Sequence, residues 1–454
     1  MPPEEFFRIQ LTASPSAGAI IGFVAVVIGF SMTTSLFMEP TSIASILTNN
    51  ATKGIIAIGI TILMISGEFD LSVGSVVGAT SMFFMVGMTE GYLGFIDPQP
   101  PLIAGFAALA FAAMLGLING VVFILTGIPS FIVTLGTLFA FRAISLVTIG
   151  GGRILRYKDY YDEFPTVFID RWILIALAVL GLAAVLFVAY RVVPQNWRYV
   201  REKWATQHDN SYFGTTSALV RGFMFVALVF VLVLVVLWLV LVAYYHFDNL
   251  DTSLQVGSFD IANGRWAFSL AQVTNPIRPI LEPIEDVLGV SFILSNPPAA
   301  NFRMAIVWWL IMVVIFQIIL VRTRYGNAVF AVGGNIGAAT AQGINSARVK
   351  VQNFVLCSVL AGVAAILEVS RNPGVDPLRG DGWELEVIAM TVIGGALLTG
   401  GYGSIIGTML GVLIFGMLKT GLVLAGMDER MFKGVVGGIM IFAVVLNNMS
   451  KRRR

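Results

Sequence analysis

Long apolar runs alternate with short polar or glycine- and proline-rich breaks along most of the chain. A helix needs about 20 consecutive apolar residues to cross the hydrocarbon layer, so each run predicts a membrane span, and the second, third and tenth runs are short ones. The pattern predicts an all-α, polytopic membrane bundle of about 12 transmembrane segments. They lie near residues 20–38, 52–66, 71–88, 102–125, 130–149, 172–190, 222–246, 302–321, 350–368, 385–399, 403–421 and 431–447.

Composition agrees with a protein set in lipid. Hydrophobic residues make up 57% of the 454 positions, charged residues only 12%, and the mean hydropathy is +0.86. The net charge of +2 and the lack of a basic cluster among aromatics exclude a nucleic-acid partner. Cys357 is the only cysteine, and His208 and His246 have no metal-ligand spacing, so no metal or cofactor is expected.

Twelve spans would place both termini on one side of the membrane. The C-terminal "KRRR" predicts that this side is the cytoplasm by the positive-inside rule. The same assignment makes Arg322, Arg324, Arg348 and Lys350 cytoplasmic. Most acidic residues then belong to the outer segments.

The stretch "GEFDLSVG" at 67–74 places Glu68 and Asp70 between two apolar runs. A charged side chain at the bilayer centre costs about 2.5–3.5 kcal/mol on insertion scales, so these carboxylates are not expected to face lipid. Glycines around them favour close packing at a broken helix, where Asp70 and Ser72 can cap the helix restarting at Leu71. A capping role and a role in lining a transport path are both open.

Five stretches in order resemble one family. They are "FDLSVGSVVGA" at 69–79, "GLINGVVFILTGIPSFIVTLGTLFAFRAIS" at 116–145, "RTRYGNAVFAVGGNIGAATAQGI" at 322–344, "GDGWELEVIAMTVIGGALLTGGYGSIIGTMLG" at 380–411 and "MFKGVVGGIMIFAVV" at 431–445. Together they are similar to permease subunits of ribose-, xylose- and galactose-type ABC importers. The resemblance implies a multi-pass protein of the bacterial inner membrane. Its partners would be ABC ATPase subunits, a periplasmic sugar-binding protein and a second permease subunit, either a copy of the chain, which is favoured, or a sibling subunit.

The resemblance also implies which residues act. For the substrate pathway we expect Asp70, Ser72, Asn119, Phe131 and Thr134, since aromatic faces and hydroxyl or amide groups suit brief contact with a neutral sugar. For ATPase coupling, segment 322–349 offers Arg324, Gly326, Gly334, Asn335, Ala338, Ala339, Gly343 and Ile344. Its glycines permit turns, and a short helix carrying Ala338 and Ala339 would end at Gly343. Family members commonly carry Glu where this chain has Gly337, so an ion pair to the ATPase there is not expected. ATP hydrolysis belongs to the partner, because the chain contains no Gly-x-x-x-x-Gly-Lys-Ser/Thr loop.

Three regions are expected: an N-terminal transmembrane half at 1–151, an inserted region at 152–301, and a C-terminal half at 302–454. The core would have about 10 spans, as in the family. The inserted region would contain two additional peripheral spans, a basic cytoplasmic loop and a periplasmic segment. "FDLSV" at 69–73 and "WELEV" at 383–387 share a pattern that suggests an inverted repeat.

Two other classes of function are weighed against this interpretation. A proton- or ion-coupled secondary transporter would use Glu68 and Asp70 as its coupling site. An integral-membrane enzyme is the weaker alternative, because no catalytic constellation is present. Which sugar is carried stays open, and so does a nucleoside, autoinducer or polyol substrate.

Overall fold

The computed structural model describes residues 17–92, 94–148, 151–170, 253–264 and 302–427, together with residues 431, 434, 437 and 438. The predicted spans at 172–190 and 222–246, most of the one at 431–447, the basic loop at 191–204 and both histidines lie outside the described residues. The chain divides into two compact units, one formed by Met1–Pro165, Gly257–Trp266 and Ala299–Arg454, the other by Thr166–Val256 and Ala267–Pro298.

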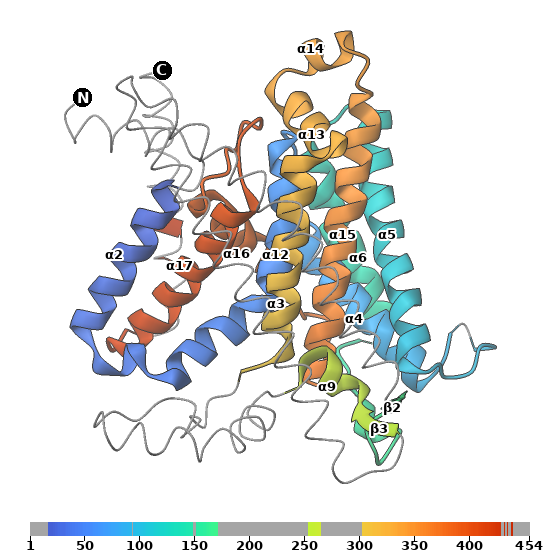
Figure 1. Cartoon of the computed structure of the whole chain (residues 1–454). Coiled ribbons are helices and arrows are strands. Elements are labelled where there is room, and N and C mark those ends of the chain that lie inside the picture. Colours follow the sequence, from blue (N-terminus) through green and yellow to red (C-terminus); the bar gives the residue numbers. More distant parts are fainter. Residues whose placement is uncertain are drawn as a thin grey trace. The chain divides into compact units, whose positions relative to one another are not determined.

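The first unit is a helical bundle (Figure 1). Its longer helices are α2 (Ala17–Thr33), α3 (Pro40–Ile65), α4 (Val73–Thr89), α5 (Pro101–Thr126), α6 (Ser130–Thr148), α12 (Met304–Arg322), α13 (Arg324–Gly334), α15 (Ser346–Arg371), α16 (Trp383–Ile393) and α17 (Ile405–Leu424). The short helices are η1 (Ser35–Met38), η2 (Tyr157–Asp159), α9 (Ser258–Asn263) and α14 (Ile336–Ala341). Strand β1 (Leu155–Arg156) pairs with β4 (Gly374–Val375) in antiparallel register, with Leu155 opposite Val375. In the other unit, β2 (Thr166–Asp170) pairs with β3 (Ser253–Gly257).

Most predicted spans in the described residues coincide with helices within a few positions, but the one expected at 385–399 is shorter, because α16 ends at Ile393. The expected start of α3 at residue 52 is wrong, because the helix begins at Pro40 and carries "TSIASILTNNATK" as regular helix. The expected start of α15 at residue 350 is also late, since Asn345 caps a helix that begins at Ser346. In both cases polar residues occupy helical positions that the apolar pattern assigns to a loop. The structure has six helices that are long and apolar enough to cross a membrane within its described residues, and α2 and α4 are shorter apolar ones.

Helices α3 and α15 form the interior of the bundle and run antiparallel. Thr52 of α3 donates a hydrogen bond to Glu368 near the end of α15 at 2.7 Å, and further along α3 Gly59 packs against the Cα of Cys357. In their most apolar windows, 83% of α3 and 72% of α15 is buried, against 33% in α5 and 28% in α12. The outer surfaces of α5 and α12 are therefore the ones exposed to lipid or to another subunit, and polar side chains concentrate on the inner helices.

Small residues set how closely these helices approach. A Cβ on Gly116 of α5 would lie 2.6 Å from the carbonyl oxygen of Phe354 and 2.8 Å from Ser358 on α15. A Cβ on Gly54 of α3 would overlap the indole of Trp309 on α12. Such contacts are typical of membrane bundles, in which association depends on close backbone packing.

Gly116→Ala tests this packing. Alanine is the better helix former by about 0.8–1.0 kcal/mol, but the contact with Phe354 should make the variant less stable, with an overpacking cost of roughly 1–3 kcal/mol. The matched control is Gly29→Ala in α2, where no atom lies within 4 Å of the added Cβ. The thermal midpoint of the purified protein in detergent should fall for the first variant and stay or rise for the second. Equal midpoints in both variants would contradict the α5–α15 contact.

Candidate functional site

The break between α3 and α4 is built around Asp70. Gly67 has a left-handed backbone with φ of 88°, which turns the chain away from α3. One oxygen of Asp70, Oδ1, accepts hydrogen bonds from the backbone N–H of Ser72 at 2.8 Å and from its hydroxyl at 2.6 Å. The helix restarts at Val73 rather than at Leu71 as expected, and Ser72 is its N-cap residue. Asp70 thus holds the cap residue in place through an Asx-type turn.

Two neighbouring helices complete this network. Asn119 of α5 donates from Nδ2 to the Ser72 hydroxyl at 2.8 Å and lies 3.5 Å from Oδ2 of Asp70. Thr134 of α6 accepts a hydrogen bond from the backbone N–H of Leu71 at 3.1 Å. The side chains of Asp70, Ser72, Asn119 and Thr134 are fully buried. Phe131 does not join them, since it is 51% exposed on the outside of α6.

An ion pair closes the same break from the other half of the bundle. Lys350, in the first turns of α15, binds the carboxylate of Glu68, and both side chains are about nine-tenths buried. The lysine Nζ also lies 5.3 Å from the ring centroid of Phe123 on α5, which adds a cation–π contact. Lys350 is therefore part of the longer α15, which begins at Ser346, and its side chain is buried in the bundle.

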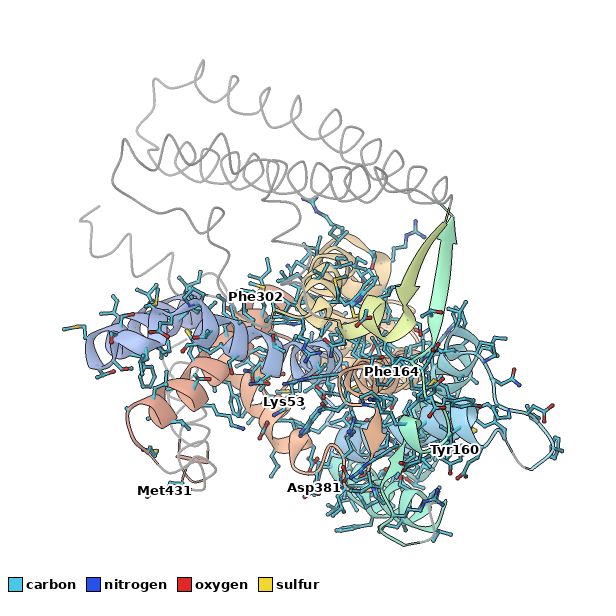
Figure 2. The ribbon with its side chains drawn as sticks, turned by 90° about the horizontal axis from the view of Figure 1, so that it is seen from below. Lys53, Tyr160, Phe164, Phe302, Asp381 and Met431 are labelled. Atoms are coloured by element: carbon cyan, nitrogen blue, oxygen red, sulfur yellow. The ribbon has the colours of Figure 1, made fainter. Side chains whose placement is uncertain are left out.

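A second ion pair has the same arrangement with the roles of α3 and α15 exchanged. Lys53 of α3 binds Glu386 in the first turn of α16, beyond the break that follows α15. Its Nζ lies 5.1 Å from the ring centroid of Trp383. In each pair, the lysine lies on one long inner helix, and the glutamate lies within or just after the break that follows the other. Figure 2 views the ribbon from below and labels Lys53.

The break between α15 and α16 packs directly on the start of α4. A Cβ on Gly74 would lie 2.2 Å from Oε2 of Glu384 and 2.4 Å from the carbonyl oxygen of Gly380. Glu384 therefore lies on the first turn of α4, where the helix dipole favours a negative charge. Asp381, one turn earlier, pairs with Arg142 of α6 at 3.0 Å. The acids of the "FDLSV" and "WELEV" motifs thus converge on the N-terminus of one helix.

Segment 322–349 folds into three consecutive capped helices. The Thr323 hydroxyl accepts from Gly326 N–H at 3.2 Å at the start of α13, Asn335 Oδ1 accepts from Ala338 N–H at 3.0 Å at α14, and Asn345 Oδ1 accepts from Arg348 N–H at 2.9 Å at α15. Each cap satisfies an N–H group that the first turn leaves unpaired. The segment is therefore an ordered structure with α14 at its tip (Figure 1).

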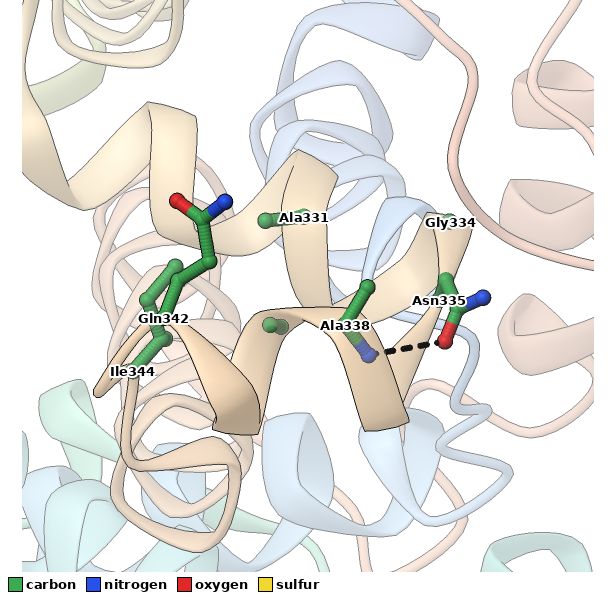
Figure 3. A pocket seen from close by; sticks show the side chains of 7 residues that line it. Ala331, Gly334, Asn335, Ala338, Gln342 and Ile344 are labelled. Atoms are coloured by element: carbon green, nitrogen blue, oxygen red, sulfur yellow. Dashed lines mark hydrogen bonds between the residues drawn. The ribbon is translucent and has the colours of Figure 1, made fainter.

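The predicted end of the short helix at Gly343 is confirmed. Gly343 has a φ of 81° and donates to the carbonyl of Thr340 at 2.9 Å, while Ile344 donates to Ala339 at 3.0 Å. This is the Schellman pattern, which favours glycine at its left-handed position. Arg324 and most of α14 are exposed, and an open groove of about 430 Å³ lies beside them (Figure 3). It is lined by Ala331, Gly334, Asn335, Ala338, Ala339, Gln342 and Ile344.

The expectation that the other glycines of this segment serve as turns is wrong. Gly326 and Gly334 belong to α13 and have no positive φ. A Cβ on Gly326 would lie 2.0 Å from the carbonyl oxygen of Leu320, and one on Gly333 would lie 1.7 Å from that of Ile65. Gly326 and Gly333 are needed for close backbone contact, which a sequence does not distinguish from turn formation.

Four charged residues of these contacts are not among the site residues expected from the sequence: Lys53, Glu386, Arg142 and Asp381. Because the chain has few charged residues, a lysine or arginine next to an apolar run is the sequence feature that could have indicated a buried cation. Their acidic counterparts could not be matched to them, because the pairs join residues 333 and 239 positions apart. Among the described residues, no group of three or more His, Cys, Asp or Glu side chains could hold a metal ion.

The sequence of the chain matches a family of membrane transport proteins. Residues 42–246 and 213–444 match the family described as the permease component of a branched-chain amino acid transport system. The chain belongs to this family. It is therefore a multi-pass membrane permease, consistent with its apolar helices.

The relatives of this permease include sugar permeases. The xylose transport system permease protein XylH of Escherichia coli K12 is 26% identical over 435 residues, which cover 96% of this chain and 92% of XylH. XylH of Haemophilus influenzae is 28% identical over 443 residues, 96% of each chain. The ribose import permease protein RbsC of Escherichia coli K12 is 40% identical over 127 residues, 28% of this chain and 40% of RbsC. No solved structure matches the chain.

The pairing of Lys350 with Glu68 can be measured in this permease. Lys350→Met would leave the buried Glu68 carboxylate without its cation, and breaking a buried pair costs about 3–5 kcal/mol. The double variant Glu68→Gln/Lys350→Met removes both charges and should regain much of that free energy of unfolding. Arg153→Ala is the exposed control, since the Arg153–Glu90 pair is about half exposed and should contribute less than about 1 kcal/mol. Strictly additive losses in the double variant would contradict the pair.

Asp70 variants separate the structural role from a need for its charge. Asp70→Asn keeps an oxygen acceptor for Ser72, so stability and transport should stay near the wild-type values. Asp70→Ala leaves the Ser72 N–H and hydroxyl without their acceptor and should cost about 0.5–2 kcal/mol. Thermal midpoint and uptake are measured on the same samples. A stable Asp70→Asn protein without uptake would show that transport requires the carboxylate charge.

Proposed function

We propose that the chain is the permease subunit of an ABC importer that carries a sugar delivered by an external binding protein. The observation that carries the proposal is the similarity to XylH, a xylose transport permease, over 96% of this chain. The similarity to part of the ribose import permease RbsC supports the same class of substrate. ATP hydrolysis is assigned to separate partner subunits, and affinity for the sugar to the binding protein.

We assign ATPase coupling to α13, α14 and the turn that follows them. The exposed tip of α14 and the groove beside it offer small side chains and free surface, which suit insertion into a partner's cleft. Ile336 is 47% exposed at this tip, an apolar group that a partner would cover. Arg322, Arg324 and Arg348 lie at the same end of the bundle, which favours a cytoplasmic position in a bacterial inner membrane. Cytoplasmic termini stay a prediction.

We also propose that a second permease subunit, a copy of this chain, completes the pathway. Asp381 is bound to Arg142 well inside α6, yet 72% of its side chain is exposed. A carboxylate at that position would otherwise face lipid, which is unfavourable. The hydrogen bonds around Asp70 would hold the break between α3 and α4 in place. A direct role in lining the path stays a prediction for Asp70, Ser72, Asn119, Phe131 and Thr134.

The alternative of an ion-coupled transporter finds less support in this geometry. Its coupling site would need Glu68 and Asp70 to exchange a proton or cation with water. Lys350 already neutralises Glu68, and Asp70 is fully buried with its hydrogen bonds satisfied by Ser72 and Asn119. ATP-dependent uptake therefore fits the structure better.

Gly343→Val tests the coupling assignment. The left-handed backbone at Gly343 disfavours a β-branched residue, so the turn after α14 should distort while the spans stay intact. In liposomes containing the ATPase and the binding protein, uptake and binding-protein-stimulated ATP hydrolysis should fall together by about tenfold or more. Gly426→Val is the matched control, because Gly426 also has a positive φ in open space but follows α17. It should keep both activities.

Two results would contradict the proposal. Wild-type uptake in liposomes that lack the ATPase would reject the ABC-importer function itself. Wild-type rates in a folded Gly343→Val protein would reject only the coupling role of this turn.

A further inference from the structure

The break between α15 and α16 carries a group of charged and aromatic side chains that are only partly covered. We call Lys53, Arg142, Asp381, Trp383 and Glu386 the break cluster. Glu386 is 22% exposed and Asp381 72% exposed in their side chains, while Lys53 and Arg142 are 11% exposed. Oxygens Oε1 of Glu386 and Oδ2 of Asp381 accept no hydrogen bond from the described residues. The cluster thus presents two open carboxylate oxygens beside an indole ring.

This cluster lies deep within the bundle. Lys53 is about 18 Å along α3 from Ile65 and about 20 Å from Pro40, at 1.5 Å per residue. Arg142 is about 18 Å along α6 from Ser130 on the same basis. Arg142 is also about 9 Å from Thr148 at the other end of α6. Both α3 and α6 are long and apolar enough to cross a membrane, so the two cations belong to candidate membrane spans. Figure 2 labels Lys53 and Asp381 in a view along the bundle.

The partial exposure of charged groups bound to membrane-spanning helices restricts the surroundings that the cluster can face. Intramembrane charges face a bundle interior or a water-filled cavity, because lipid offers them no hydrogen bonds. The first break shows the enclosed case, with Asp70 and Ser72 fully buried. The second break is open, with Leu378 58% and Leu385 56% exposed on either side of Asp381. Its open carboxylate oxygens therefore require water or a polar solute.

We propose that the break cluster is the sugar-contacting site of the translocation path. This inference rests on the proposed function. The Trp383 ring, which is partly exposed and has Lys53 over one face, supplies an apolar surface for the C–H groups of a sugar, and Glu386 and Asp381 accept hydrogen bonds from its hydroxyls. Lys53 and Arg142 each neutralise the carboxylate that they bind, and Glu384 of the same break lies at the N-terminus of α4, whose dipole offsets its charge, so that the site suits a neutral polyhydroxyl solute rather than a cation. Few open acceptors make the contact weak, which favours passage.

Thiol labelling tests whether the break faces water. The only native cysteine, Cys357, is fully buried, so the wild type provides an unreactive background. Leu385→Cys keeps every charge of the break cluster and should react with a membrane-impermeant methanethiosulfonate reagent in lipid nanodiscs, at a rate near that of Asp162→Cys in an exposed loop. Val314→Cys is the lipid-facing control, being 45% exposed midway along α12, and should react at least about tenfold more slowly. A Leu385→Cys rate as low as that of Val314→Cys would overturn the proposal.

Transport variants test contact with the sugar. Trp383→Leu removes the ring and should lower the uptake rate at limiting sugar-loaded binding protein by up to about tenfold, while stimulated ATP hydrolysis persists. Trp383→Phe keeps a ring and should restore most of the uptake. Unchanged uptake in Trp383→Leu, or no rescue by Trp383→Phe, would overturn the sugar contact. If the wild type itself shows no ATP-dependent sugar uptake in the same assay, the proposed function fails instead, and the labelling result still reports on the water-filled path.

Discussion

Two reciprocal ion pairs fix the antiparallel register of α3 and α15, on which the rest of the bundle depends. Lys53 on α3 binds Glu386 beyond α15, and Lys350 on α15 binds Glu68 beyond α3. An unpaired charge in the hydrocarbon layer costs several kcal/mol, so sliding one helix by a turn would strand four charges at once. Each lysine Nζ also lies over an aromatic ring, that of Trp383 for Lys53 and that of Phe123 for Lys350. The ion pairs therefore select one register more strongly than apolar packing does. Apolar packing energy changes little when a helix slides so that one set of aliphatic side chains takes the place of another.

The two breaks are related in construction but differ in state. Each follows one of the inner helices, and each sends an acid to a lysine of the opposite half. The break after α3 is closed by Ser72, Asn119 and Thr134, whereas the break after α15 leaves Asp381 exposed. The two breaks therefore share their ion-pair pattern and differ in how far they are enclosed, while the inverted repeat suggested by the "FDLSV" and "WELEV" motifs stays a prediction.

Apolar periodicity was enough to predict the peripheral helices and fell short on the inner ones. Helix α5 was expected at 102–125 and is Pro101–Thr126, because a lipid-exposed helix must be apolar along its length. The predicted start of α3 was too late because of the polar stretch "NNATK", in which Asn50, Thr52 and Lys53 are buried against other helices while Asn49 is exposed. The capped turn at Gly343 was predictable, since its bonds are local. The Lys350–Glu68 pair was not, because its residues are 282 positions apart and only the folded chain brings them together.

Backbone contacts at glycines connect the segment at the tip of the bundle to the first break. Gly333 at the end of α13 touches the carbonyl of Ile65, where Gly401 also donates a hydrogen bond at 2.8 Å. The Cβ position of Gly400 lies 2.9 Å from the Cα of Gly67. No layer of side chains separates these three segments, and close-packed backbone has little compressibility. A displacement of α13 therefore moves Ile65 and Gly67 directly, and through them Glu68 and Asp70, so the position of the break follows that of the segment assigned to ATPase coupling.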